Sequence, residues 1–365
     1  YSKEKIIKLN KKLKILYEKK ETEYTNKYNK DIFELRKQKS ILGKHPKTYN
    51  KMNGISKYRP LSRSYFKLQE IMTDFHCIDD KKPIYSSAHI AEGPGGFIEA
   101  FIKKRNNKND KVYAITLKSN TKEIPGWKKA KYFLQRHPNI KISYGKDGTG
   151  NIYNVDNIKH FSTLGVEENK VDFITADGGF DFSIDFNKQE LLSYRLLFCQ
   201  IVIALSTQKI GGCFVCKFFD LFHLSTIKLI WLLSCFYKNV HISKPYTSRP
   251  ANSEKYIIAK QFIGISPSYL NKLYEVVDLW ETLQDKKFYV NDIFDVQLSK
   301  KFISIINEYN YYIVKRQTES IIKTLLLSKK IIPHFLLKNI RKQQFYNAKK
   351  WCIDYNIPHY SRFNI

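Results

Sequence analysis

The sequence is poor in cysteine, in glycine and proline, and in long apolar runs. Six Cys in 365 residues make no disulfide framework, which predicts buried free thiols in a reducing compartment. With 15 Gly and 11 Pro the composition disfavours a collagen-like chain. The longest apolar runs, residues 196–205 and 229–235, are shorter than the roughly 20 residues that span a bilayer, and no signal-peptide pattern opens the sequence. We therefore expect an intracellular protein that is neither secreted nor membrane-bound.

Acidic residues are also scarce relative to basic ones. The chain has 34 Asp and Glu against 63 Lys and Arg, a formal net charge of +29. Hydrophobic residues make up 43%, which suffices for a large core and argues against a disordered basic tail. The charge predicts a polyanionic partner, nucleic acid before an anionic membrane surface. It does not separate an enzyme acting on RNA from a passive RNA-binding protein.

The cysteines give no sign of a metal site. Cys213 and Cys216 form the one CxxC spacing, within a segment predicted to be a strand. A spacing of three places two side chains of a strand on opposite faces, so zinc binding there is rejected. We expect no metal requirement.

The arrangement of apolar segments predicts an α/β catalytic domain between two helical extensions. Residues 1–58 form a basic N-terminal extension with helical periodicity, and residues 266–365 form a mostly helical, basic C-terminal extension packed on the catalytic domain. Between them, in residues 59–265, short apolar runs alternate with helical patterns, which is typical of a mostly parallel sheet covered by helices. The predicted strands lie at 84–91, 111–116, 140–143, 171–176, 213–218, 240–243 and 256–259. The predicted helices lie at 62–74, 96–105, 187–206, 224–237, 270–284, 298–314, 317–328 and 334–350.

A glycine-rich segment follows the first predicted strand and opens a helix. It comprises Ala91, Glu92, Gly93, Pro94, Gly95, Gly96 and Phe97. Glycine permits positive φ and close approach of the backbone to a ligand, and the start of the helix offers free N–H groups. The segment is neither a Walker loop nor a GxGxxG loop. Taken alone, it favours a structural turn over a binding loop.

Four charged residues follow strands or flank them at the same predicted edge. They are Lys67, Asp177, Lys217 and Glu254. Ligands of such sheets bind at the carboxyl ends of the strands, and a Lys inside an apolar strand needs a partner or a function. Each residue taken singly could be a surface charge, but their joint placement beside the glycine segment predicts an active site.

These residues carry a resemblance to a known family. Residues 60–263 resemble the RrmJ/FtsJ-type 2′-O-ribose methyltransferases, and most of all the mRNA cap-1 methyltransferases of eukaryotes and large DNA viruses. The similar stretches are residues 91–97, 144–152, 176–180, 217–222 and 244–256, with a weaker one at 351–358. The resemblance implies a Rossmann-like, S-adenosylmethionine-dependent methyltransferase sheet that is mostly parallel with an antiparallel last strand. It also implies that capped mRNA is the substrate, methylated at the first transcribed nucleotide.

The resemblance assigns roles to individual residues. It implies a catalytic tetrad of Lys67, Asp177, Lys217 and Glu254. It implies cofactor contacts by Ser62 (where relatives often have Asn), by residues 91–97, by Asp147 and Gly148 beside the adenine, and by Asp177. The residues expected to contact RNA are Asn187, Lys188, Gln189, Ser248, Arg249, Asn252, Ser253 and Glu254. Cap binding is expected upstream of Lys67, around Arg36 to Ser40, and in the C-terminal part.

The chemistry of the tetrad suggests a mechanism. A ribose hydroxyl is a poor nucleophile that must be aligned and lose its proton, and a Lys whose pKa is lowered by burial and neighbouring cations can act as the base. Lys217 is the candidate base, whereas His89 and His223 are interpreted as structural. Two alternatives stay open: 2′-O-methylation of rRNA or tRNA, and a non-catalytic RNA-binding subunit. Partners among the capping or transcription machinery are expected, and DNA is not. A viral protein would be cytoplasmic and a cellular one nuclear.

Overall fold

The structure, a computed structural model, describes residues 55–118, 126–163, 170–179, 188–285, 290–328 and 334–360. Almost all of the predicted N-terminal extension, including residues 36–40, lies outside the described residues, as does Asn187.

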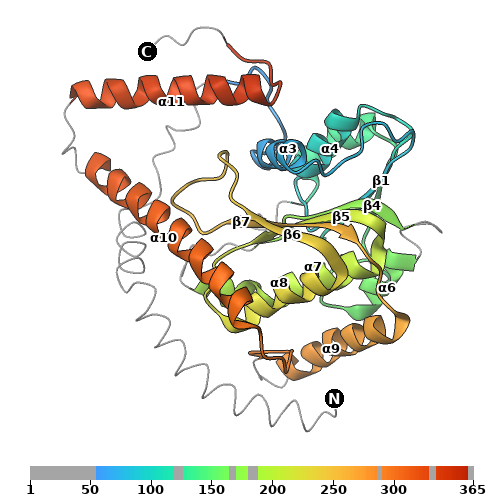
Figure 1. Ribbon diagram of the computed structural model, residues 1–365. Coiled ribbons are helices and arrows are strands. Elements are labelled where there is room, and N and C mark those ends of the chain that lie inside the picture. Colours follow the sequence, from blue (N-terminus) through green and yellow to red (C-terminus); the bar gives the residue numbers. More distant parts are fainter. Residues whose placement is uncertain are drawn as a thin grey trace.

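A seven-stranded sheet forms the centre of the molecule, with the order β3-β2-β1-β4-β5-β7-β6 (Figure 1). Strand β7 runs antiparallel to both of its neighbours, and the other pairs are parallel. The predicted fold class, including the antiparallel last strand, is confirmed. The strands are β1 (Ser86–Ile90), β2 (Lys111–Ile115), β3 (Ile140–Ser143), β4 (Val171–Ala176), β5 (Gln208–Phe218), β6 (Tyr237–Ser243) and β7 (Lys255–Phe262).

Helices cover both faces of the sheet (Figure 1). Helices α3 and α4 lie on one face, and α6, α7 and α8 lie on the other, with α9 beneath them. The longest helix, α10, was predicted as two shorter ones, and α5 and α6 were not predicted. The helices are α3 (Ser64–Asp74), α4 (Gly96–Arg105), α5 (Lys131–Arg136) after the 3-10 turn Lys128–Ala130, α6 (Val155–Thr163), α7 (Gln189–Thr207), α8 (Leu224–Phe236), α9 (Pro267–Asp285), α10 (Lys300–Ser328) and α11 (His334–Asp354).

The two faces of the sheet have separate hydrophobic cores. Because neighbouring side chains of a strand point in opposite directions, alternate residues of β5 enter different cores. Cys213 and Val215 pack with helices α3 and α4, and Cys216 packs with α7 and α8. The predicted separation of the two cysteines is therefore confirmed. Among the described residues, no group of three or more His, Cys, Asp or Glu could hold a metal ion.

Helix α7 is the central core helix of its layer. By length and composition it is the one helix in the described part of the chain that could cross a membrane, because the apolar run at 196–205 extends into a 19-residue helix. Within the protein, 89% of its most apolar window is buried. Part of this burial comes from α9, whose Trp280 ring lies 5.3 Å from the ring of Tyr194 and 5.8 Å from that of Phe198.

The last two helices contact loops at the carboxyl edge of the sheet. On α10, the Asn310 side chain donates to the Leu221 carbonyl at 2.7 Å, and Gln317 donates to the Ala251 carbonyl at 3.1 Å. The end of α11 continues into residues that pair with the chain before α3, where the Lys57 amide donates to the Pro358 carbonyl at 2.8 Å. Both C-terminal helices thus brace the edge at which the predicted site lies.

Candidate active site

The four residues predicted to be catalytic meet at one edge of the sheet. Asp177 directly follows β4, Lys217 is the second-last residue of β5, and Glu254 directly precedes β7. Strand alternation places the three on the face that packs against α3, since Phe173, Val215 and Tyr256 belong to the same core as Leu68 and Ile71 of that helix. Because β7 is antiparallel, its beginning lies beside the end of β5, which brings Glu254 next to Lys217. Lys67 reaches the same point from α3.

The four side chains form two ion pairs. Lys67 Nζ lies 2.7 Å from Glu254 Oε1, and Lys217 Nζ lies 3.2 Å from Asp177 Oδ1. All four side chains are only 12 to 16% exposed, so these pairs are shielded from water far more than surface pairs. Lys217 Nζ also donates to the Asp177 carbonyl at 2.7 Å. A Cβ at Gly179 would lie 3.1 Å from Lys217 Nζ, so glycine leaves room for the ammonium group.

Tyr256 connects the two pairs, and the sequence did not single it out. Its hydroxyl donates to Asp177 Oδ1 at 3.0 Å, and Lys67 Nζ lies 6.0 Å from the centre of its ring. Tyr256 is also paired directly with Lys217 across the β5–β7 ladder. The signal that would have found it is strand periodicity, because Tyr256 stands two residues after Glu254 and therefore on the same face.

The protonation of the site differs from the expectation for Lys217. Burial acts to lower its pKa, but the negative charges of Asp177, Glu254 and Glu92 outweigh burial, and the pKa of Lys217 lies above its usual value. The expected lowering by a neighbouring cation is therefore wrong for the free protein. Burial acts to raise the pKa of Glu254, yet Lys67 and Lys217 hold that pKa below its usual value. At neutral pH Lys217 is therefore an ammonium group and Glu254 is ionised.

The glycine segment lies beside the site and is packed too tightly for larger residues. A Cβ at Gly96 would lie 2.1 Å from Ser62 Oγ and 2.3 Å from Ser64 Oγ, and Gly95 has φ +98°. Ser62 therefore lies against the segment, and its contact with a cofactor stays a prediction. Trp127 borders Gly95, and its buried indole N–H has no hydrogen-bond acceptor in the described part of the chain. A glycine-lined turn, a helix start and a buried orphan donor together fit a polar ligand with an aromatic or ribose part.

Glu92, inside the glycine segment, is fully buried behind the ion pairs. Its carboxyl accepts a hydrogen bond from Thr175 Oγ1 at 2.5 Å, and Thr175 is in turn 2.7 Å from His89 Nδ1. Burial and the nearby Asp177 raise the pKa of Glu92 well above its usual value. Burial lowers the pKa of His89 to about 3, which keeps its ring neutral. The packing of His89 agrees with its interpretation as a structural residue.

Asp147 and Gly148 stand in an exposed loop after β3. The Asp147 carboxylate accepts hydrogen bonds from the amide and hydroxyl of Thr149 at 2.8 and 2.7 Å and from Asn157 at 2.9 Å. These bonds lower the pKa of Asp147. Gly148 has φ +75°, and a Cβ there would meet nothing within 4 Å. The loop shape is therefore held by Asp147, and the space around Gly148 is open to a ligand.

The residues predicted to contact RNA lie mainly in the loop from 244 to 254. Lys244 Nζ binds the carbonyls of Asn252 and Glu254 at 2.8 and 2.7 Å, which ties the two ends of this loop together. Ser248 and Ser253 are buried. The Ser248 hydroxyl donates to Glu254 Oε1 at 2.8 Å, and that of Ser253 donates to Gln189 Oε1 at 2.7 Å.

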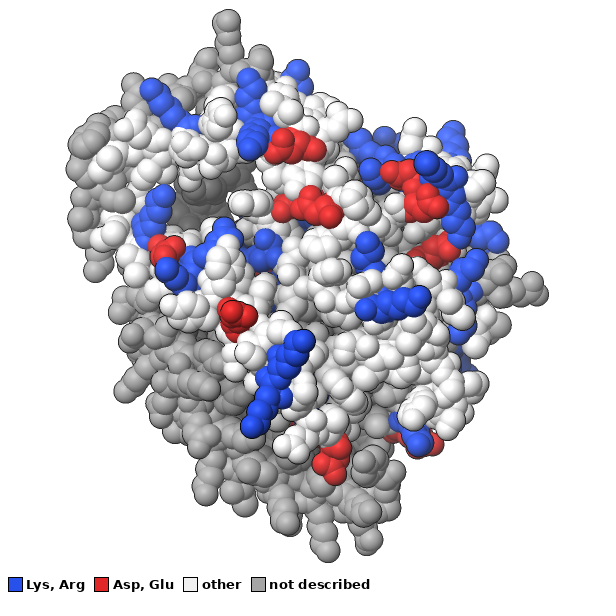
Figure 2. Space-filling model, viewed as in Figure 1, with Lys and Arg blue, Asp and Glu red and all other residues white. Residues whose placement is uncertain are grey.

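Two arginines border the same loop. Arg249 is exposed, and Arg63, which the sequence did not single out, lies near it. Burial and the charge of Arg249 both lower the pKa of Arg63. Lys188, just before α7, is exposed. In the view of Figure 2 the basic residues form several separate groups with acidic residues between them. On this face the described basic residues therefore do not form one continuous patch.

The loop after β5 is anchored by a second buried acid, Glu190 of α7. Its carboxylate accepts hydrogen bonds from the Phe222 amide at 3.1 Å and the His223 amide at 2.9 Å. Burial and the nearby Asp220 raise the pKa of Glu190 to about 8. These hydrogen bonds fix the segment that follows β5, at a point five residues after Lys217.

Replacing Glu190 with Gln should remove part of the pH dependence of stability. Because the folded-state pKa is raised, Glu190 contributes stability fully below its unfolded value near 4.5, and this contribution is lost as the pH rises towards 8. The wild-type free energy of unfolding should therefore fall between pH 5 and 8 by up to about 1.4 kcal/mol per pH unit more than that of the variant. Denaturant titrations at several pH values measure this. The exposed Glu275→Gln is the control, and equal slopes for wild type and Glu190→Gln would contradict the assignment.

The fold and site together define a class. A seven-stranded sheet with one antiparallel strand, a glycine segment after β1 and a charged site at the carboxyl ends of β4 and β5 are the features of a Rossmann-like methyltransferase. The model of the FtsJ-like methyltransferase family matches residues 60–262. The chain belongs to the FtsJ-like methyltransferase family, as the sequence predicted.

The curated relatives are longer proteins. The chain is 31% identical over 266 residues to cap-specific mRNA (nucleoside-2′-O-)-methyltransferase 1 of Caenorhabditis elegans. The matched region covers 69% of this chain and 28% of that protein. It is 39% identical over 180 residues to the mouse protein of the same name, covering 47% of this chain and 21% of that protein. The chain therefore spans less than a third of the length of these relatives.

Other similarities are more distant. A relative from Caenorhabditis briggsae, named as an inactive cap-specific methyltransferase 1B, is 28% identical over 254 residues, covering 66% of this chain and 29% of that protein. A solved structure described as a ribosomal RNA methyltransferase of Plasmodium falciparum is 22% identical and covers 57% of this chain and all of its own, with a TM-score of 0.41. That structural likeness is too weak to carry an argument.

Proposed function

We propose that this chain is an S-adenosylmethionine-dependent mRNA cap methyltransferase that modifies the 2′-hydroxyl of the first transcribed nucleotide. The observation that carries the proposal is the pair of shielded ion pairs, Lys67–Glu254 and Lys217–Asp177, at the sheet edge beside the glycine segment. The names of the nematode and mouse relatives support capped mRNA as the substrate.

The residues of the glycine segment suit S-adenosylmethionine. Ser62, the segment 91–97 and the orphan Trp127 indole would hold its polar groups, and Asp147 and Gly148 would border its adenine. When bound, it would supply an electrophilic methyl group on a sulfonium sulfur, which keeps the electron pair of the carbon–sulfur bond when the methyl group is transferred to the ribose oxygen. Asp177 and Glu254 place negative charge near this positively charged donor.

In this proposal the four charged residues orient and stabilise the hydroxyl. The Lys217 ammonium, held by Asp177, stabilises negative charge that develops on the ribose oxygen, since a fixed cation in a shielded site acts without reorganisation. Glu254, held by Lys67 and Ser248, accepts a hydrogen bond from the hydroxyl and aligns it.

The surface around the 244–254 loop is proposed to bind the RNA chain. Arg249 and Arg63 present two positive charges near each other beside Glu254, as a phosphate group requires. Lys188, Gln189 and Asn252 are proposed to contact the nucleotide, as is Asn187, which lies outside the described residues. Ser248 and Ser253 are proposed to act through the protein groups that they hold.

The test compares one RNA in two forms. The wild-type chain is incubated with labelled S-adenosylmethionine and either cap-0 RNA or uncapped RNA of the same sequence. We expect transfer to the capped RNA to be faster by about tenfold or more, because cap contacts contribute binding energy that the uncapped RNA lacks. Equal or faster transfer to uncapped RNA would favour an rRNA or tRNA substrate, and no transfer to either would contradict an enzymatic role.

A further inference from the structure

Glu70 is a buried acid that lies one helical turn after Lys67 on α3. It is 3% exposed, and within the described ranges no cation is within salt-bridge distance of it. Its carboxylate accepts hydrogen bonds from the Tyr246 amide at 2.6 Å and from the amide and hydroxyl of Thr247 at 3.3 and 3.1 Å. Burying an acid is costly unless hydrogen bonds compensate for the lost water. Three hydrogen bonds from the loop at residues 244–254 thus offset part of the cost of burying Glu70.

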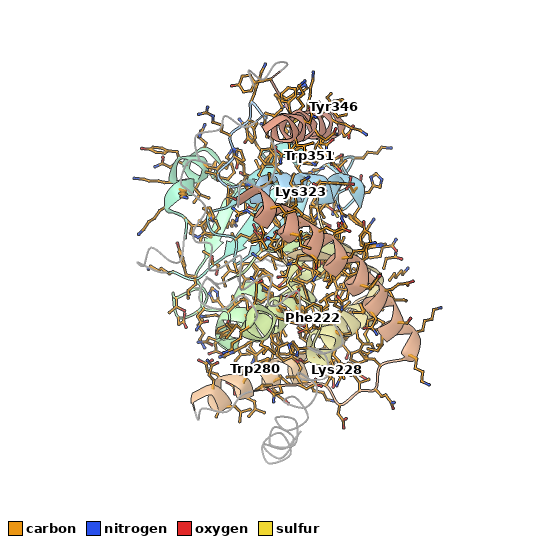
Figure 3. The ribbon with its side chains drawn as sticks, turned by 90° about the vertical axis from the view of Figure 1, so that its left-hand side faces the viewer. Phe222, Lys228, Trp280, Lys323, Tyr346 and Trp351 are labelled. Carbon is orange, nitrogen blue, oxygen red and sulfur yellow. The ribbon has the colours of Figure 1, made fainter. Side chains whose placement is uncertain are left out.

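The fourth hydrogen bond to Glu70 comes from the C-terminal helix. The Trp351 indole N–H donates to Glu70 Oε2 at 3.0 Å. Figure 3 shows Trp351 beneath α11, on the side facing α3. The indole also packs edge-on against Phe66, with ring centres 5.7 Å apart. Glu70 thus joins α3, the 244–254 loop and α11 at one buried point.

The contacts of Glu70 form a closed series that includes Glu254 and Lys67 of the active site. From Glu70 the series passes to Thr247, to the next residue Ser248, and through the Ser248 hydroxyl to Glu254 at 2.8 Å. It continues from Glu254 to Lys67 at 2.7 Å and returns along one turn of α3. Because every link is a hydrogen bond, an ion pair or a covalent stretch, displacing Thr247 displaces Ser248 and the carboxylate of Glu254.

We propose that Glu70 is a positioning residue of the active site and that Trp351 of α11 anchors it. In this role the pair sets the position of Glu254 relative to Lys67, and the C-terminal helix becomes part of the catalytic scaffold. The kinetic part of this inference rests on the proposed methyltransferase function. The structural part, the restraint of the 244–254 loop by Glu70, does not.

The chain offers a matched control one turn after Glu70 on α3. The hydroxyl of Tyr355, directly after α11, donates to both carboxylate oxygens of Asp74 at 2.8 and 3.0 Å. Tyr355→Phe removes this hydrogen bond between α3 and the C-terminal part but leaves the contacts with the loop intact. Trp351→Phe removes the bond to Glu70 and keeps an aromatic ring against Phe66.

The first experiment measures hydrogen exchange of peptides covering residues 244–254 in wild type, Glu70→Ala, Trp351→Phe and Tyr355→Phe. The Tyr246 and Thr247 amides should exchange about tenfold faster in Glu70→Ala, to a lesser degree in Trp351→Phe, and at the wild-type rate in Tyr355→Phe. Unchanged protection in Glu70→Ala overturns the inference whether or not the chain transfers methyl groups.

The second experiment measures transfer to cap-0 RNA by the same variants and by Glu70→Gln. We expect kcat to fall about tenfold in Glu70→Ala with the KM for S-adenosylmethionine nearly unchanged, because a small displacement of Glu254 misaligns the hydroxyl. Glu70→Gln, which keeps one acceptor, should recover part of the rate. Equal losses in Glu70→Ala and Tyr355→Phe would overturn the positioning role, whereas an inactive wild type would overturn the proposed function alone.

Discussion

Replacing Lys217 with Ala is expected to lower kcat for methyl transfer to capped RNA by about 100- to 1000-fold, the usual cost of removing one preorganised charge-stabilising donor. The variant loses the cation that faces Asp177 at 3.2 Å and leaves that carboxylate with the Tyr256 hydroxyl. Steady-state rates with cap-0 RNA give kcat directly, and a binding titration with S-adenosylmethionine shows whether the cofactor still binds.

The control for Lys217 is Lys209→Ala, which removes an exposed lysine from the other end of the same strand. Its rate should match the wild type. The pH–rate profile separates two roles of Lys217. The pKa of Lys217 lies above its usual value. A cationic role therefore predicts that loss of the Lys217 proton does not raise the rate between pH 7 and 10. A rate that climbs about tenfold per pH unit over that range would restore the neutral-base hypothesis and contradict the cationic role.

Replacing Glu254 with Gln is the second change with a large expected effect. The substitution preserves size but removes the negative charge that Lys67 holds at 2.7 Å and that also faces Lys217. We expect kcat to fall by about 100-fold or more, because the hydroxyl loses its aligning acceptor and Lys67 is left without its partner. Single-turnover rates with cap-0 RNA measure the chemical step.

The stability of the Glu254→Gln variant provides an independent check. Because the folded-state pKa of Glu254 is lowered, its charge stabilises the fold at pH values above about 4.5, and this contribution is lost as the pH falls through the folded value. The wild type should therefore lose more stability than Glu254→Gln on acidification. A Glu254→Gln variant with wild-type kcat would remove Glu254 from the active site, whatever its stability.

The order of elements was largely predictable because the catalytic domain alternates between two periodicities. Every predicted strand is present, and β2, β3 and β4 begin at the predicted residue. Helices α5 and α6 were missed because they are only six and nine residues long, shorter than the windows over which helical periodicity is judged. The break placed between 314 and 317 does not exist, since α10 continues from Lys300 to Ser328 without a helix breaker.

The meeting of the tetrad was predictable from topology, but its electrostatics were not. Carboxyl ends of parallel strands share one edge, which is sufficient to bring Asp177 and Lys217 together. Burial lowers the pKa of Lys217, and Asp177, Glu254 and Glu92 raise it above its usual value; no sequence pattern gives the distances of these acids from Lys217. The same applies to Glu70 and Trp351, which are 281 residues apart in the chain.

We propose that this site methylates one ribose oxygen of capped RNA. The position of the added methyl group tests this proposal most directly. Cap-0 RNA is incubated with the chain and S-adenosylmethionine, digested to nucleotides and cap dinucleotides, and analysed by mass spectrometry. We expect one added methyl group, on the 2′-oxygen of the first transcribed nucleotide, formed at least about 100-fold more slowly with Lys217→Ala. A methyl group on a base or on internal riboses, or full activity in Lys217→Ala, would contradict it.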